Sequence, residues 1–237
     1  MKIALIGQGA MGQLVGALAS AAGYEVALTL SSQDAARSAL ELAEELRGLD
    51  VAIDFSIAQA VLKNVEACAL SGVPLVEGTT GWRDEQSKAL EIVRAHDGAL
   101  VYGANFSIGV NLFYRLVAYA GELFQTTEDY APFIEEAHHS RKRDAPSGTA
   151  LRLKELLAAQ LPWDIPVTST RAGHIPGTHR VGFDSISDQI TLTHTARSRE
   201  GFAQGALAAA RWIKGRRGVY EFSEALDEIL KTVTSDE

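Results

Sequence analysis

Short apolar runs alternate with amphipathic segments over the first hundred residues. The runs predict buried strands, and the segments between them have apolar positions three or four apart, which is the helical period. Such repeated strand–helix units favour a parallel sheet with helices on both faces. The predicted strands are Lys2–Ile6, Tyr24–Leu30, Asp50–Phe55, Val73–Glu77 and Ala99–Tyr102. The predicted helices are Gln13–Ala22, Asp34–Arg47, Ile57–Leu70 and Arg83–His96.

The pattern changes after about residue 107. Helices are predicted over Ile108–Phe124, Ala150–Gln160, Gly201–Lys214 and Glu221–Thr232. A strand is predicted over Tyr130–Ala137, and three later strands, Pro166–Arg171, His179–Asp184 and Gln189–Ala196, are separated by Gly and Pro, which favours antiparallel hairpins.

These elements predict an α/β protein with two domains. The first is an N-terminal Rossmann-type, doubly wound parallel sheet that binds a dinucleotide, formed by residues 1–106 and rejoined by about 214–237. The second, residues 107–213, is an α+β domain with a mixed sheet, expected to bind the substrate and to mediate oligomerisation.

A glycine-rich loop, Gly7-Gln8-Gly9-Ala10-Met11-Gly12, lies between the first predicted strand and the first helix. This is the G-x-G-x-x-G pattern in the context that the dinucleotide fingerprint requires. The first glycine allows the turn, the second lets a pyrophosphate approach the backbone, and the third lets helix and strand pack closely. We therefore predict that all six residues bind a nicotinamide cofactor.

The end of the second predicted strand reads Leu30-Ser31-Ser32-Gln33, and the first acid after it is Asp34. An acid at the end of this strand would bind the adenosine ribose of NAD and repel a 2′-phosphate. Without one, Ser31 and Ser32 could bind the phosphate, and Arg37 could reach it. The pattern favours NADPH, or no strong preference between NADPH and NADH.

Two further loops follow predicted strands, where ligands of parallel sheets bind. They are Gly78–Gly81 and Ala104–Ser107, and their small polar residues suit a cofactor. The first of them, taken by itself, is also compatible with a simple turn.

The densest group of chemical functions is EEAHHSRKRDAPSGTA, residues 135–150. Asp144 or Ser147 can cap the following helix, whose free N–H groups would attract an anion. The cations Arg141, Lys142 and Arg143 lie beside this helix start. Adjacent histidines on a strand point to opposite faces, which argues against a shared metal, and we predict none. A solvated basic loop with a Ser cap remains the alternative.

Composition limits the classes of function. The 237 residues are 46% hydrophobic and 22% charged, which is typical of soluble globular proteins. No apolar run reaches the ~20 residues of a membrane span. A single cysteine, Cys68, favours the reducing cytoplasm. The net charge of −8 argues against nucleic acid, whereas the local cations suit a small anionic substrate.

The motifs together resemble the 4-hydroxy-tetrahydrodipicolinate reductase (dihydrodipicolinate reductase) family, over essentially the whole chain. The resemblance lies in GQGAMG (7–12), AIDFS (52–56), EGTTG (77–81), ANFSIGVN (104–111), EEAHHSRKRDAPSGTA (135–150), RAGHIPGTH (171–179) and HTARSREGFAQGALAAARWI (194–213).

The resemblance implies reduction of a cyclic dicarboxylate by NADPH or NADH on the diaminopimelate route to lysine. It implies that His138 donates the proton, with Lys142 beside it at the substrate, and that the enzyme is a homotetramer joined through the second domain. A substrate carboxylate would lie at His139, Ser147, Gly148 and Thr149. The nicotinamide would lie at Gly78, Thr79, Thr80, Ala104, Asn105 and Phe106.

Two alternatives remain open. One is another two-domain dehydrogenase of amino-acid metabolism, which would share the first domain but lacks the 135–150 motif. The other is a nucleotide-sensing module without catalysis, which turnover would distinguish from an enzyme.

Overall fold

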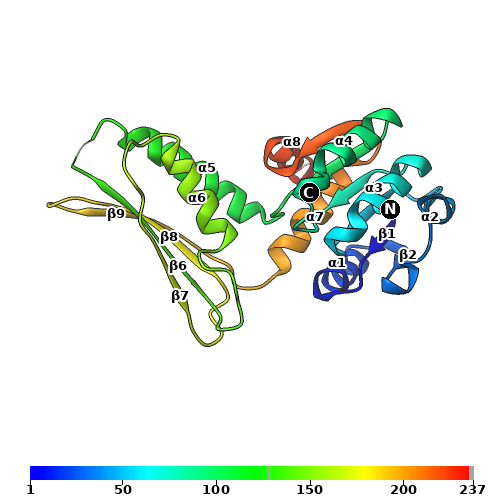
Figure 1. The fold of residues 1–237 in the computed structure, drawn as a ribbon, viewed down its shortest axis with the longest axis horizontal. Helices are drawn as coiled ribbons and strands as arrows, with labels where there is room; N and C mark the ends of the chain where they lie inside the picture. The colour runs from blue at the N-terminus through cyan, green and yellow to red at the C-terminus, as the bar shows by residue number, and fades with distance from the viewer. Residues whose placement is uncertain (128, 235–237) are drawn as a thin grey trace. The chain divides into compact units, whose positions relative to one another are not determined.

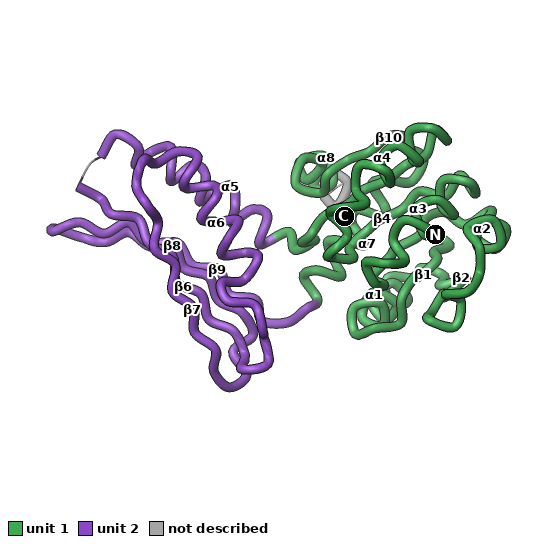
Figure 2. The backbone as a smooth tube through the Cα atoms, viewed as in Figure 1, with its two compact units in different colours: residues 1–108, 200–237 green, residues 109–199 purple. Residues whose placement is uncertain are grey.

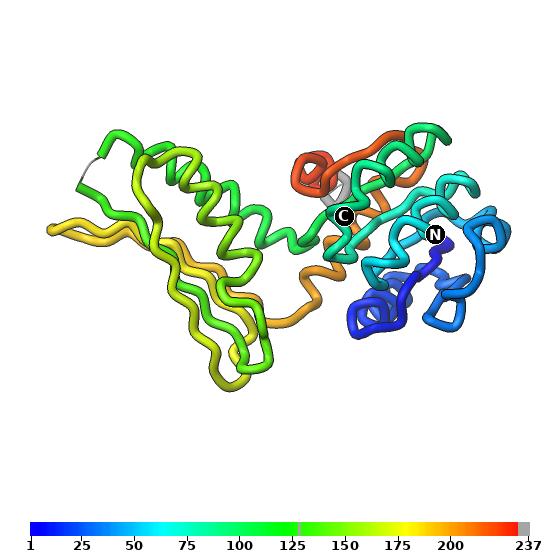
Figure 3. The backbone as a smooth tube through the Cα atoms, in the orientation of Figure 1, coloured from blue at the N-terminus to red at the C-terminus, as the bar shows by residue number. Residues whose placement is uncertain are grey.

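The structure, a computed structural model, describes residues 1–127 and 129–234. The chain forms two compact units (Figure 2), and each is described by itself. Unit 1 comprises Met1–Ile108 and Glu200–Glu237, of which 235–237 lie outside the described residues. Unit 2 comprises Gly109–Arg199. Figure 3, coloured along the chain, shows that the chain returns to unit 1 after completing unit 2.

Unit 1 contains a six-stranded sheet in which every pair of neighbours is parallel (Figure 1). Its apolar runs are buried on both faces, as parallel sheets require. In spatial order, the strands are β10 (Gly218–Glu221), β5 (Ala99–Tyr102), β4 (Leu75–Glu77), β3 (Val51–Asp54), β1 (Lys2–Ile6) and β2 (Glu25–Leu30).

Helices cover both faces of this sheet. One core includes side chains from α1 (Ala10–Ala21), α7 (Glu200–Ile213) and α8 (Phe222–Thr234). The other includes side chains from α2 (Ala39–Leu46), α3 (Ala58–Ser71) and α4 (Gln86–Ala95). The Rossmann-type, doubly wound sheet predicted from the sequence is confirmed.

Two features of unit 1 differ from the prediction. The strand β10 was not predicted, although it pairs with β5 and completes the sheet. Helix α7 was assigned to the second domain, whereas it belongs to unit 1. The reason is its apolar face, in which Ala203, Ala206 and Ala210 are fully buried and allow close packing.

The helix predicted over Asp34–Arg47 is also shorter than expected. A 3₁₀ turn, Ser32–Asp34, comes first, and α2 begins only at Ala39. Ser31 and Ser38 each form a capping box, with Asp34 and Glu41 respectively. Each box starts its own helical segment, because the serine side chain accepts a hydrogen bond from a backbone N–H in the first turn.

Unit 2 contains a four-stranded sheet in the order β7-β6-β8-β9. Its strands are β6 (Ala131–His138), β7 (Val167–Arg171), β8 (Thr178–Asp184) and β9 (Gln189–Thr195). The predicted mixed sheet is confirmed, since β8 runs antiparallel to β6 and β9 whereas β7 is parallel to β6. The prediction of hairpins holds for β8 and β9 but not for β7, which pairs with β6 instead of β8.

Helices α5 (Ile108–Phe124) and α6 (Gly148–Ala158) lie on one face of this sheet (Figure 1). Apolar residues of β6 and β8 that face the helices, including Ile134, Val181 and Phe183, form the core with Val117 and Leu153. Burial alternates along β6, so alternate residues face the helices. None of the helices in the described part of the chain is long and apolar enough to span a membrane.

Candidate active site

The glycine-rich loop of unit 1 is built for close approach to its backbone. Gly7 has φ +97°, which favours glycine, and a Cβ on Gly12 would overlap the carbonyl oxygen of Gly7. Gly9 caps α1, and nothing lies within 4 Å of where its Cβ would be. The first turn of α1 has no acid, so its N–H groups and dipole favour a phosphate. The loop therefore fits a dinucleotide.

The loops after β3 and β4 rest on two buried acids, Asp54 and Glu77, which are cross-strand neighbours. Asp54 accepts from the backbone N–H of Ser56 (2.7 Å) and the side chain of Asn64 (2.7 Å). Glu77 accepts from the backbone N–H of Thr79 (2.6 Å). Burial raises the pKa of both carboxyl groups, and the charge of Asp54 raises the pKa of Glu77 further. Both shifts favour a protonated form of the pair, which lies beneath the two loops.

The predicted nicotinamide residues are not equally accessible. Thr80 and Ala104 are exposed, whereas Thr79 is buried. Asn105 accepts the backbone N–H of Ser107 through Oδ1 (2.9 Å). The side chain of Phe106 lies in the core, with ring centroids 4.6 Å from Phe222, so only its backbone could meet a ligand.

The predicted phosphate site after β2 is already occupied by a carboxylate. Asp34 accepts the backbone N–H of Ser31 (2.8 Å) and an N–H of Arg37 (3.2 Å). Arg37 also donates to Glu45 (2.6 Å), and these two acids raise its pKa. Lys63 donates to the carbonyl oxygens of Ala35 and Arg37. Arg37 is thus paired with two carboxylates, and its role as a phosphate ligand stays a prediction.

In unit 2, the helix-facing side of the sheet changes from apolar to polar along β6. Ile134 is followed at two-residue intervals by Glu136 and His138, both buried. Across the sheet, Glu136 pairs with Ser169 of β7 and His179 of β8, while His138 pairs with Arg171 of β7. This polar end of the sheet adjoins the 135–150 motif.

The buried carboxylate of Glu136 lies between two partners. One oxygen contacts Nδ1 of His138, and the other accepts from Arg171 (2.7 Å). Burial would raise the pKa of Glu136, but the hydrogen bonds from Arg171 and Ser169 and the charge of His138 lower it to about 2. Burial lowers the pKa of His138, and Glu136 opposes that shift.

Ser147, rather than Asp144, caps α6, since its hydroxyl accepts from the backbone N–H of Ala150 (3.2 Å). Nε2 of His179 lies 3.0 Å from the same hydroxyl. Burial lowers the pKa of His179 to about 4, so its ring is neutral near pH 7. This contact joins the N-terminal cap of α6 to strand β8.

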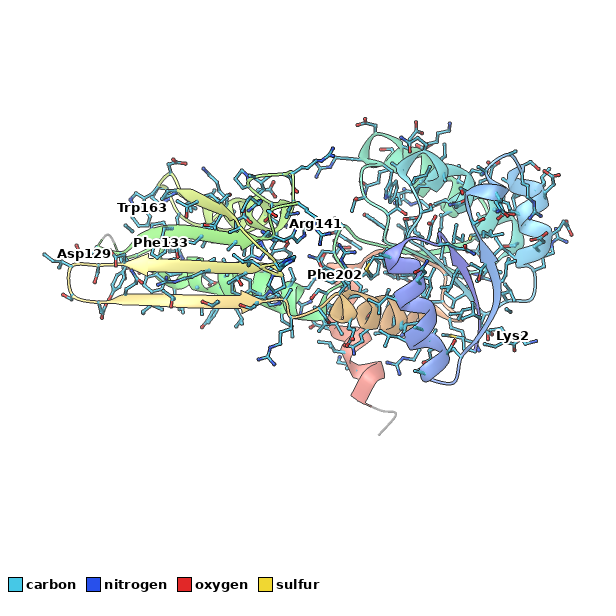
Figure 4. All side chains as sticks on the ribbon, turned by 90° about the horizontal axis from the view of Figure 1, so that it is seen from below. Lys2, Asp129, Phe133, Arg141, Trp163 and Phe202 are labelled. Carbon is cyan, nitrogen blue, oxygen red and sulfur yellow. The ribbon has the colours of Figure 1, made fainter. Side chains whose placement is uncertain are left out.

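Lys142 and Asp144 form an ion pair (2.9 Å) in front of this helix. Burial opposes the ionised form of Asp144, but hydrogen bonds from Lys142 and from the backbone N–H of Gly148 lower its pKa. The helix start and Lys142 thus hold a carboxylate already. Thr149 and His139 are half-buried, Gly148 is exposed, and so is Arg141, labelled in Figure 4.

Glu136, His138 and His179 present potential metal ligands within 4.8 Å of one another. However, Arg171 already provides positive charge at Glu136, and Lys142 opposes further positive charge at His138. The arrangement fits proton transfer better than cation binding.

Family comparisons cover both units. Residues 1–106 match the family described as dihydrodipicolinate reductase, N-terminus, and residues 109–226 match its C-terminus. A 4-hydroxy-tetrahydrodipicolinate reductase from Christiangramia forsetii is 39% identical over 98% of this chain and 100% of its own length. The chain belongs to the dihydrodipicolinate reductase family. These reductases are oxidoreductases that use a nicotinamide cofactor.

Two other members of the reductase family are also similar to this chain. A 4-hydroxy-tetrahydrodipicolinate reductase from Anaeromyxobacter dehalogenans is 38% identical over 78% of this chain and 76% of its own length. A dipicolinate-bound dihydrodipicolinate reductase from Paenisporosarcina sp. TG-14 shares the fold, with TM-score 0.73 and 22% identity over 93% of this chain and 97% of its own.

The sequence motif pointed to His138 and Lys142 as candidate site residues, a prediction that stays open, but not to their neighbours Glu136, Arg171 and His179. Glu136 precedes His138 by two residues in a predicted strand, and this spacing puts both on one face. That signal was available. The contributions of Arg171 and His179 depend on strand pairing, which the sequence pattern did not give.

Proposed function

We propose that this chain reduces 4-hydroxy-tetrahydrodipicolinate to tetrahydrodipicolinate with NAD(P)H, on the diaminopimelate route to lysine. The observation that carries the proposal is the grouping, in one unit, of an acid–histidine pair with a helix start that holds a carboxylate. The end-to-end identity to a named reductase supports the same reaction.

Asp144 indicates where a carboxylate of the substrate could bind. Its carboxylate takes the N–H of Gly148 and the ammonium of Lys142, which are the two kinds of group that a substrate carboxylate needs. A substrate carboxylate can replace Asp144 there, with Ser147, Thr149 and His139 around it. This exchange would cost little electrostatically, because one carboxylate replaces another.

His138 and Lys142 divide the chemistry. After the substrate has lost its hydroxyl group as water, the bound nicotinamide would supply a hydride to an electron-poor ring carbon. Lys142 stabilises the negative charge that develops on the substrate, and the Nε2 proton of His138 passes to the adjacent carbon. In unit 1, Gly7–Gly12 would hold the pyrophosphate, while Gly78–Thr80 and Ala104–Asn105 would adjoin the nicotinamide.

We also propose that NADH is favoured over NADPH. The N–H of Ser31, which could have met a 2′-phosphate, donates to Asp34 instead. The charge of Asp34 would repel the phosphate, and Arg37 is held by Asp34 and Glu45. This reverses the preference expected from the sequence, because the 3₁₀ turn returns an acid to the end of β2.

A cytoplasmic homotetramer remains our proposal for the assembly and its location. The buried, free thiol of Cys68 is compatible with a reducing compartment. The outward edge strands β7 and β9 of unit 2 are open for pairing or packing with a second copy.

The test is oxidation of NADH and of NADPH in parallel, with substrate made in situ by a synthase from pyruvate and aspartate semialdehyde. Substrate-dependent oxidation, with the larger kcat/KM for NADH, is the expected result. A folded protein that binds either nucleotide and oxidises neither would be a binding module, and the reductase proposal would fail.

A further inference from the structure

We propose that Glu136, clamped by Arg171, positions His138 as the proton donor, with Nδ1 bound to the carboxylate and Nε2 directed to the substrate. The inference rests on the proposed function, in which His138 supplies the proton. Glu136 is a positioning residue, since it touches the imidazole and not the reacting atoms.

The carboxylate of Glu136 is fixed in place. Its side chain has 0% exposure, and Arg171 donates to one oxygen at 2.7 Å. The same Arg171 nitrogen donates to the backbone oxygen of Asp144 at 2.5 Å, so the main chain holds the guanidinium. A hydrogen bond from Ser169 adds a further restraint. The second oxygen is therefore kept against Nδ1 of His138.

The imidazole has one buried and one accessible nitrogen. Nδ1 is buried against Glu136. Nε2 has no hydrogen bond within the described residues and is not among the buried ring nitrogens. A Cβ at Gly177, where φ is +139°, would lie 3.3 Å from Nε2. The glycine thus keeps this edge of the ring clear, and Nε2 is the nitrogen that can meet a ligand.

The charges that face His138 show why Glu136 matters. Lys142 of the loop, Arg171 of β7 and burial all favour the neutral ring, and His179 of β8 lies edge-on at 5.0 Å. Glu136 is the one group among these neighbours that favours the imidazolium. Without its charge, none of these neighbours favours the protonated ring of His138.

The first experiment is Glu136→Gln, because glutamine keeps the size and an acceptor for Arg171 but turns an amide N–H towards Nδ1. We expect the basic limb of the kcat profile to move down by roughly one to three pH units, as for loss of an adjacent opposite charge. At about pH 8, kcat should fall at least ~10-fold, and the loss should shrink only as the pH falls below the ordinary histidine range, with KM changed less than about twofold.

Glu135→Gln is the matched control. Glu135 is the next residue on β6, but it is exposed, faces the other side and pairs with Arg180 at 3.1 Å. Its profile should match the wild type. An unchanged profile for Glu136→Gln, or equal loss at every pH with raised KM, would overturn the positioning role. Inactivity of the wild-type protein would instead refute the proposed function.

A second measurement does not depend on the variant folding. ¹⁵N NMR of histidine-labelled wild-type protein reports which ring nitrogen carries the proton, and His138→Gln identifies the signal among the six histidines. The positioning role requires the neutral ring to carry its proton on Nδ1, towards Glu136. A neutral ring protonated on Nε2 would overturn the proposal whatever the activity.

Discussion

Each unit buries acid near the carboxyl end of a strand, but the two units neutralise it differently. In unit 1, Asp54 and Glu77 are bonded by neutral groups, and their pKa values are raised. In unit 2, Glu136 is bonded by Arg171 and contacts His138, and its pKa is lowered to about 2. Burial favours a bound proton on the first pair, and cationic partners balance the charge of Glu136.

The difference matches what each unit has to do. A bound proton on Asp54 or Glu77 would remove one negative charge from beneath loops proposed to meet an anionic cofactor. A carboxylate held by a guanidinium stays ionised throughout the working pH range and can impose its charge on a neighbouring imidazole. The first arrangement limits charge at the proposed cofactor surface, and the second directs charge to the proposed proton donor.

The largest effect should follow from Arg171→Met, which leaves Glu136 buried without its cation. Breaking a buried ion pair in this way costs about 3–5 kcal/mol, so urea should unfold unit 2 at a clearly lower concentration. Arg180→Met removes an exposed pair with Glu135 and should cost at most ~1 kcal/mol. Equal losses for the two variants would contradict the comparison.

Lys142→Ala tests the other cation of unit 2. Loss of one preorganised contact to developing charge should lower kcat by at least ~100-fold. Lys154→Ala, in the exposed pair with Asp164 on the same unit, should leave kcat near the wild-type value. Near-normal turnover by Lys142→Ala would reject its assigned role.

Glu77→Gln tests the buried acids of unit 1 through the pH dependence of the free energy of unfolding. The raised pKa values mean that the folded pair keeps a proton that the unfolded chain loses, so stability falls as pH rises above the ordinary carboxyl range. The slope is up to ~1.4 kcal/mol per pH unit for one proton. Glutamine removes that proton, and the free energy of unfolding should depend less on pH.

Thermal or urea unfolding between about pH 5 and pH 8 measures this slope. Glu66→Gln, at an exposed position of α3, should keep the wild-type slope. A slope for Glu77→Gln as steep as the wild type would mean that the pair in unit 1 does not share a proton.

The smallest effect concerns Asp34, a less buried acid at the end of a strand. Asp34→Ser removes the charge that faces a 2′-phosphate, so the ratio of kcat/KM for NADPH over NADH should rise about tenfold, on the scale of one to two surface charge pairs. Glu44→Gln on α2 serves as control. An unchanged ratio would place the adenosine ribose elsewhere.

The fold was predictable where the signal is local. Apolar runs and helical periods located the first five strands and the helices between them, because buried parallel strands are continuously apolar. Strand β10 has only four residues after two arginines and a glycine, and its partner β5 lies more than a hundred residues away. Such a short edge strand is specified by pairing, which no local pattern reveals.

The candidate site likewise contains residues that a local motif reveals and contacts that only the folded chain creates. The glycine loop, His138 and Lys142 could be located because each lies in a contiguous motif. The pairing of Arg37 could not be predicted, since it arises only when a 3₁₀ turn brings Asp34 back to Ser31. The burial of the Phe106 side chain could not be predicted, because its contact with Phe222 depends on a helix far along the chain.

That unit 1 is assembled from both ends of the chain has a consequence for synthesis. A nascent polypeptide emerges with β1 to β5 long before α7 and β10 arrive to cover one face and the edge of β5. Unit 2 is contiguous and has all its partners as soon as residue 199 is released. On the ribosome, unit 2 can therefore finish folding before unit 1 does. The sheet of unit 1, which still lacks α7 and β10, is the part that a chaperone would have to protect.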